Sequence, residues 1–245
     1  MITFNEEDFK GSRLRCLQIT SQPPERVRSF LNALVSPYAE VMGGDTCWSP
    51  GGFLQPAETK LVDDNQFLDG ERREELKKWW LAVQRGNMPN WDLISRCDIG
   101  GGAGLLLVEA KAHEDEFKCD KTGAKDENRD SIIRAIREAN QELNGELPGF
   151  HISADAFYQL SNRFAFGWKL AKMGIPTVLV YLGFLDAEEM APNKLLRTPE
   201  QWERLIKEKA ADCIPPEAWS RRFVDGKFTA LIRSARVDIS AEVVQ

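Results

Sequence analysis

Helical patterns of apolar and polar positions occur in five stretches of the chain. Apolar residues that recur every three or four positions share one face of a helix. Residues 71–85 carry acids in the first turn and bases behind them, and Gly86 is expected to end this helix. The other stretches are the first half of 24–42, which Pro37 is expected to break, 127–145, 153–173 with Ser153 as the cap, and 198–213 with Thr198, Pro199 and Gln201 as a capping box.

Strand patterns occupy the middle and the end of the sequence. Residues 90–99 and 104–113 flank a glycine-rich turn, which predicts an antiparallel hairpin. Residues 175–185 are almost entirely apolar, which is typical of a strand buried on both faces, and 226–240 predict a last strand. This order of elements predicts an α/β protein with a mixed central β-sheet flanked by helices. No shift in composition divides residues 1–245, so we expect a single domain.

The composition is that of an ordinary globular protein. Among the 245 residues, 42% are hydrophobic and 29% are charged. No apolar run reaches about 18 residues, so neither a membrane span nor a membrane partner is expected. The first residues lack the pattern of a secretory signal, and the five cysteines are scattered singly. Both features favour reduced thiols and a cytoplasmic location.

The net charge of −6 restricts how the protein could bind a polyanion. A domain that binds nucleic acid usually presents a basic surface. Here the basic residues gather locally, at 71–80 and 219–228. Any contact with nucleic acid must therefore be local.

The predicted hairpin carries the strongest candidate chemistry. The apolar run Leu105–Val108 leads directly into Glu109, Ala110 and Lys111. Alternate strand residues share a face, so Glu109 and Lys111 point the same way, and pairing across the turn brings Asp92 close to both. Two converging carboxylates repel each other unless a cation lies between them, and oxygen ligands suit Mg²⁺ or Mn²⁺. A lysine beside them can orient a water molecule and offset phosphate charge.

Two other residues compete for roles in this cluster. Asp98 shares the strand face with Asp92, but it lies beside the turn and far from Glu109. His113 continues the face of Glu109 as a further candidate ligand or acid–base group.

These residues resemble the motif of the PD-(D/E)XK nuclease superfamily. That motif has a proline and an acid at the head of one strand, a turn, and then acid–any residue–lysine at the end of the next apolar strand. Glu109 matches the second acid and Lys111 the lysine, whereas Pro89 stands three residues before Asp92 and not next to it. Residues 71–185 are similar in order to the restriction-endonuclease-like core, with 1–70 and 186–245 as N- and C-terminal additions.

The resemblance implies a metal-dependent nuclease that acts on nucleic acid, with DNA as the expected substrate. In that interpretation Asp92, Glu109 and the Ala110 carbonyl bind Mg²⁺ or Mn²⁺, and Lys111 positions the water. Gln159, on the helix after the motif, is a candidate substrate-binding residue. The superfamily often adds a third acid from its first helix, and three residues stay open for that role: Glu40, Glu74 and Glu75. The alternative is a non-catalytic binding or scaffold protein on the same fold.

Overall fold

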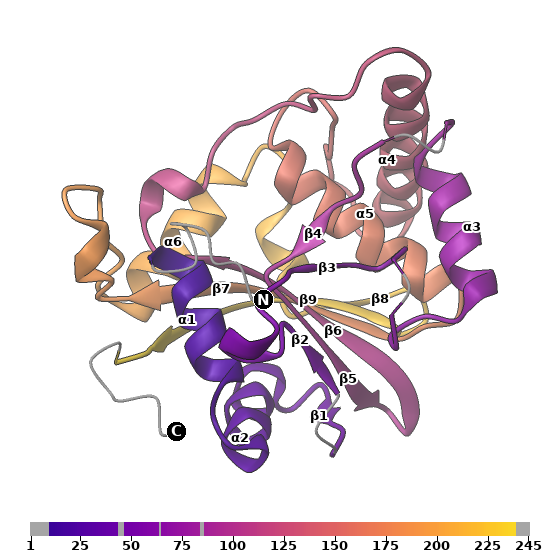
Figure 1. Cartoon of the computed structure of the whole chain (residues 1–245). Coiled ribbons are helices and arrows are strands. Elements are labelled where there is room, and N and C mark those ends of the chain that lie inside the picture. Colours follow the sequence, from indigo (N-terminus) through magenta and orange to yellow (C-terminus); the bar gives the residue numbers. More distant parts are fainter. Residues whose placement is uncertain (1–9, 44–46, 64, 84–85, 239–245) are drawn as a thin grey trace.

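The chain folds around a seven-stranded sheet with the order β1-β5-β6-β7-β9-β8, in which β2 also pairs with β5 (Figure 1). The computed structural model describes residues 10–43, 47–63, 65–83 and 86–238. The strands are β1 Glu40–Val41, β2 Trp48–Ser49, β3 Thr59–Lys60, β4 Asn90–Trp91, β5 Leu93–Ile99, β6 Gly102–Lys111, β7 Thr177–Leu185, β8 Arg222–Phe223 and β9 Phe228–Arg236. The helices are α1 Gly11–Thr20, α2 Pro24–Val35, α3 Gly70–Trp80, α4 Asp126–Glu146, α5 Tyr158–Lys172 and α6 Pro199–Lys209, with short 3-10 turns at Gly52–Leu54, Glu114–Glu116, Glu188–Met190 and Pro216–Ala218.

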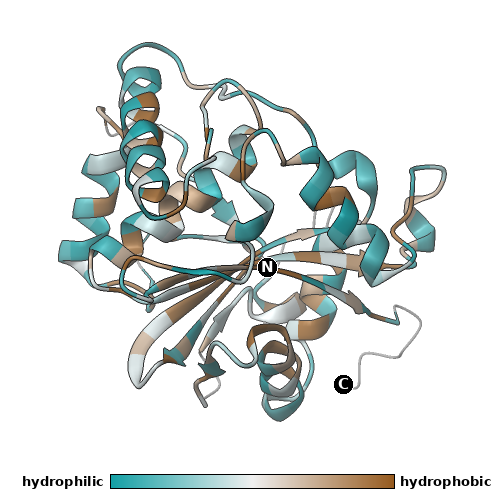
Figure 2. Cartoon of the chain, turned by 180° about the vertical axis from the view of Figure 1, so that it is seen from behind, coloured by the Kyte–Doolittle hydropathy of each residue, from teal (hydrophilic) through white to brown (hydrophobic). Residues whose placement is uncertain are grey.

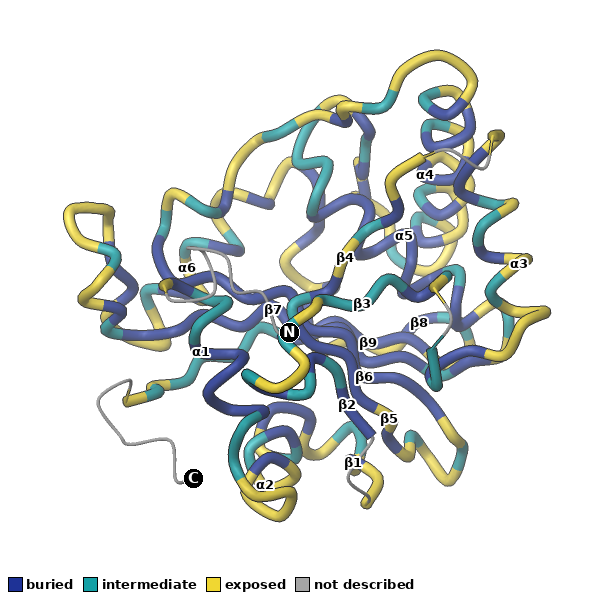
Figure 3. Tube along the Cα trace, in the orientation of Figure 1, coloured by how far each residue is buried: buried dark blue, intermediate teal, exposed yellow. Residues whose placement is uncertain are grey.

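The sheet is mixed, as the sequence predicts. Strands β6, β7 and β9 run parallel, while β5 and β8 pair antiparallel at either side. All nine residues of β7 are buried, which confirms the strand predicted from its continuous apolar run. Figure 3 shows this burial running through the middle of the sheet.

Helices cover both faces of the sheet (Figure 1). Leu105 and Leu107 of β6 belong to the core cluster formed with α3, α4, α5 and α6. Leu106, Val108 and Ala110 belong to a second cluster, formed with α1 and α2. Figure 2 shows apolar strands inside and hydrophilic helix surfaces outside. Because side chains alternate along β6, residues 109 and 111 fall on the face that α5 covers.

Two helices differ from their predicted ends. Helix α3 stops at Trp80, well before Gly86, because the buried Leu81 takes an extended conformation and leaves the helix. Helix α5 begins at Tyr158 and not near Ser153. Phe157 has a left-handed backbone with φ of 46°, which interrupts the helix on its N-terminal side, and the Ser153 hydroxyl accepts a hydrogen bond from Asp155 N (3.0 Å) within a bend.

The remaining predicted helices form, although α6 ends at Lys209 and not at Cys213. Helix α2 ends at Val35, two residues before Pro37, and α4 spans the predicted stretch. The Thr198 hydroxyl caps α6 by accepting a hydrogen bond from Gln201 N (3.1 Å). None of the helices in the described ranges combines the length and the apolar composition needed to cross a bilayer.

The contact between α5 and β9 predicts that a glycine-to-alanine substitution in the helix destabilises the protein, which is the opposite of its usual effect. An alanine usually stabilises a helix relative to glycine by up to about 1 kcal/mol. At Gly167 of α5, an added Cβ would lie 2.2 Å from Cε2 of Phe228. We therefore expect Gly167→Ala to lower the free energy of unfolding by about 1–3 kcal/mol, measured by urea denaturation.

Gly145→Ala is the matched control, because a Cβ on this α4 glycine would meet no neighbouring atom within 4 Å. It should leave stability unchanged or raise it slightly. Equal effects of the two substitutions would contradict the packing argument.

Candidate functional site

The hairpin that carries the predicted site forms as expected. Gly100 and Gly101, with φ of 64° and 85°, make its turn, and β6 begins directly after them at Gly102. The register places Leu93 opposite Val108, which brings Asp92 to the level of Glu109. At Asp92 the chain bends, so that β4 pairs with β3 while β5 pairs with β6.

A cavity of about 480 Å³, here called the acidic cavity, lies where these strands separate. All five residues predicted for the site line it: Asp92, Glu109, Ala110, Lys111 and Gln159. The cavity is completed by Ser12, Glu58, Lys60, Asn87, Met88, Asn90, Glu116 and Arg163. Residues from α1, the segment 58–60, the hairpin, the 3-10 turn Glu114–Glu116 and α5 thus meet at one place. Four of the lining residues are acids: Glu58, Asp92, Glu109 and Glu116.

Glu109 is buried, with 1% of its surface exposed, and both of its carboxylate oxygens have cationic partners. Lys111 Nζ donates to Oε1, and Arg163 Nε donates to Oε2 at 2.7 Å. Burial alone would raise the pKa of Glu109, but Arg163 and Lys111 together hold that pKa below its usual value. Glu109 therefore stays ionised.

Lys111 is also buried, with 6% exposed. Although Lys111 is the last residue of β6, it is not exposed at the strand exit, because it is still paired with Gly183 of β7. Burial acts to lower the pKa of Lys111, but the charges of Glu109 and Asp92 raise it above its usual value. The Glu109–Lys111 contact is thus a buried ion pair and not a surface salt bridge.

Asp92 differs from Glu109 in the contacts that its carboxylate makes: Lys111 acts on it only through its charge and forms no ion pair with it. Its Oδ2 accepts a hydrogen bond from Ala110 N at 2.8 Å, and within the described residues no ion pair to it is formed. Burial, reinforced by the charge of Glu109, raises the pKa of Asp92 to about 7. The acidic cavity therefore contains one carboxyl group whose ionisation is opposed at neutral pH.

Arg163 fixes the position of Glu109 from α5. Its NH2 donates to Asn90 O (2.6 Å) and its NH1 to Asn162 Oδ1 (2.9 Å). Its guanidinium lies 4.3 Å from the centre of the buried Trp91 ring. The sequence places Arg163 one helical turn after Gln159, and the structure brings both side chains to the acidic cavity.

The three acids considered for a further metal ligand lie elsewhere. Glu40 is in β1 opposite Asp98, at the far end of the hairpin, and both Glu74 and Glu75 are exposed on α3. Glu58 occupies the acidic cavity in their place and is held by Arg13 at 2.7 Å. No local pattern marks Glu58, because its position depends on the pairing of β3 with β4.

The two competing residues also lie outside the acidic cavity. Asp98 pairs with Ala103, and its Oδ1 accepts a hydrogen bond from Gly101 N at 2.8 Å, which stabilises the turn. His113 Nε2 lies 3.2 Å from Glu116 Oε1 and does not line the cavity.

The donor set fits a hard cation, although the described residues contain no group of three or more His, Cys, Asp or Glu arranged to hold a metal. Magnesium commonly uses one or two carboxylates together with water and substrate oxygens, so three protein acids are not required. Asp92, Glu109 and the Ala110 carbonyl offer oxygen atoms alone, which is the preference of Mg²⁺ and Mn²⁺. Comparison of the chain with protein-family models, curated proteins and solved structures finds no match.

The raised pKa of Asp92 predicts a specific dependence of stability on pH. Between pH 4 and 7 the folded protein keeps a proton that the unfolded chain, with a pKa near 3.8, has lost. The contribution of Asp92 to stability therefore falls as pH rises through this window. In a chelating buffer at pH 8, Asp92→Asn should raise the free energy of unfolding by roughly 1–4 kcal/mol, and at pH 4 it should have little effect.

Melting temperatures of the wild type and Asp92→Asn, recorded from pH 4 to pH 8, measure this difference. If the melting temperatures of the two proteins changed with pH in parallel, ionisation of Asp92 would carry no cost in the folded state, and its pKa would not be raised.

Proposed function

We propose that the protein is a metal-dependent nuclease that hydrolyses phosphodiester bonds, with DNA as the expected substrate, on a restriction-endonuclease-like core. The observation that carries the proposal is Asp92, a half-buried carboxyl group that lines the acidic cavity beside Glu109, has a pKa near 7 and forms no ion pair within the described residues. Burial of such a group destabilises a protein, and groups of this kind concentrate at functional sites. A divalent cation would supply the charge that Asp92 lacks.

The residues of the acidic cavity have separate roles in this proposal. Asp92, Glu109 and the Ala110 carbonyl would hold Mg²⁺ or Mn²⁺, which when bound stabilises charge on the phosphate and activates water. Lys111 keeps its proton because of the carboxylates around it, so it can donate hydrogen bonds to the attacking water and to a phosphate oxygen. Arg163 holds Glu109 in place, and Gln159 offers an amide to the substrate.

A non-catalytic role for the same fold is the second candidate. Its support is the complete pairing of Glu109, whose two oxygens already bond to Lys111 and Arg163. In that case the three side chains would join β6 to α5 and hold no metal. The two candidates differ in whether a cation and Lys111 have any effect beyond stability.

Metal binding gives the first test. A ligand that binds the folded state alone raises its stability, by about 2.7 kcal/mol at a concentration 100 times Kd. We expect Mn²⁺ or Mg²⁺ to raise the melting temperature at pH 8, and Asp92→Asn to abolish that shift. Asp98→Asn, which alters an acid on the same hairpin outside the cavity, should retain it. An equal shift in the Asp92 variant would remove the proposed metal site.

The second test concerns Lys111 and the cleavage rate. Lys111→Ala should reduce cleavage of plasmid or oligonucleotide DNA by roughly 10² or more, the effect of losing an electrostatic catalytic group. It should also lower the melting temperature, since Glu109 loses one of two buried partners. Rates must therefore be compared at a temperature where both proteins are folded.

Lys169→Ala is the control for this test, because Lys169 forms an ion pair with Glu75 on the protein surface. It should leave cleavage unchanged. If the wild type cleaves DNA and Lys111→Ala cleaves it equally fast, Lys111 has no catalytic role.

A further inference from the structure

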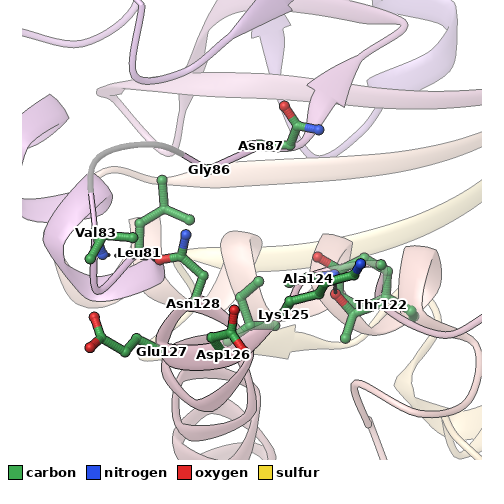
Figure 4. Close-up of a pocket in the computed structure, with 13 residues that line it drawn as sticks. Leu81, Val83, Gly86, Asn87, Thr122, Ala124, Lys125, Asp126, Glu127 and Asn128 are labelled. Atoms are coloured by element: carbon green, nitrogen blue, oxygen red, sulfur yellow. Dashed lines mark hydrogen bonds between the residues drawn. The ribbon is translucent and has the colours of Figure 1, made fainter.

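A second cavity, of about 780 Å³, lies beside the acidic cavity (Figure 4). Its walls come from the segment after α3, from the loop that leads into α4, and from Tyr158 at the start of α5. The Val83 and Leu81 side chains form one wall in Figure 4, and Thr122, Ala124 and Lys125 lie across from them. We call it the neutral cavity.

The two cavities are adjacent, as their lining residues show at two places. Asn87 lines both of them. On α5, Tyr158 lines the neutral cavity and the next residue, Gln159, lines the acidic cavity. A substrate whose phosphate lies in the acidic cavity would therefore have the neutral cavity directly beside it.

The lining of the neutral cavity combines apolar side chains and one aromatic ring with the polar side chains of Asn87, Thr122 and Asn128. Leu81, Val83, Ile132 and the Tyr158 ring supply apolar surface. Val83 is 43% exposed and is one of three large apolar side chains exposed in the described part of the chain. The charged residues that line the cavity are one base and two acids, all on the segment Lys125–Glu127, so the lining has no excess of positive charge to bind a phosphate.

We propose that the neutral cavity binds an unpaired nucleobase of the nucleotide next to the scissile phosphate, and that the protein therefore prefers single-stranded DNA. This inference rests on the proposed nuclease function. The cavity volume lies within the usual range of small-molecule sites, about 300–1,000 Å³. A base within a duplex is paired and stacked, and it could enter only by leaving the helix. Aromatic rings such as Tyr158 bind bases of any sequence by stacking.

Binding of a fluorescent strand tests the proposal. The full chain carrying Lys111→Ala, which should cleave at least about 10² more slowly, is titrated in Mg²⁺ into a short single strand containing 2-aminopurine and into its blunt duplex, within a time in which the DNA stays uncut. We expect tighter binding of the single strand and a change in 2-aminopurine emission. Tyr158→Ala added to this protein should weaken single-strand binding by about tenfold or more and abolish the emission change. Tyr158→Phe, which keeps the ring, should bind like its parent.

Tyr38→Ala is the matched control, because Tyr38 is also half-buried but contacts Ser220 and lines neither cavity. If Tyr158→Ala fails to fold, Val83→Asp at the exposed wall replaces it and should weaken single-strand binding to a similar degree. Equal affinity for single strand and duplex, or unchanged binding in the folded cavity variants, overturns the proposal.

The outcomes also separate this proposal from the one on which it rests. Wild-type cleavage that depends on Lys111 but proceeds equally on single strand and duplex, without an effect of Tyr158→Ala, leaves the nuclease and removes the base site. Binding that depends on Tyr158 without cleavage of any strand removes the nuclease and leaves a single-strand binding site.

Discussion

The charge of Glu109 inside the sheet is the constraint on which the arrangement of the site depends. A carboxylate with 1% of its surface exposed must be balanced by nearby cations, or folding would protonate it or fail. Lys111 provides one cation from the same strand, and Arg163 provides the other across the gap to α5. Arg163 is in turn fixed by Asn90 and Trp91. The ion pair therefore joins β6, α5 and the segment before β5 into one unit.

The bend at Asp92 creates the acidic cavity beside these elements. A straight strand would continue to pair with β6, but the chain separates there and β4 turns to β3. This separation admits Glu58 and Lys60 to the acidic cavity and leaves Asp92 at its edge with a backbone hydrogen bond from Ala110. One bend in an extended chain thus determines which acids meet. Because these acids lie close together, Asp92 ionises less readily than an isolated aspartate: burial and the charge of Glu109 both raise its pKa.

The parts that could be predicted from the sequence follow from local rules. Alternation along β6 indicates that Glu109 and Lys111 share a face, and the glycine turn brings Asp92 toward them. Burial of Lys111, the arrival of Glu58 and the early end of α3 could not be predicted in this way. Each depends on packing between segments far apart in the chain: α5 covering the end of β6, β3 pairing with β4, and Leu81 entering the core. The left-handed Phe157, which moves the start of α5, likewise has no marker in the local sequence.

The carboxyl group of Asp92 also makes the acidic cavity a site of proton exchange. With a pKa near 7, it is present as acid and as carboxylate in comparable amounts at neutral pH. Any cation that binds the carboxylate must release a proton from part of the population, so its apparent affinity falls by up to about tenfold for each pH unit below 7. Binding and proton release become a single event. The heat of binding would then depend on the enthalpy of ionisation of the surrounding buffer, because the buffer takes up the proton that Asp92 gives away.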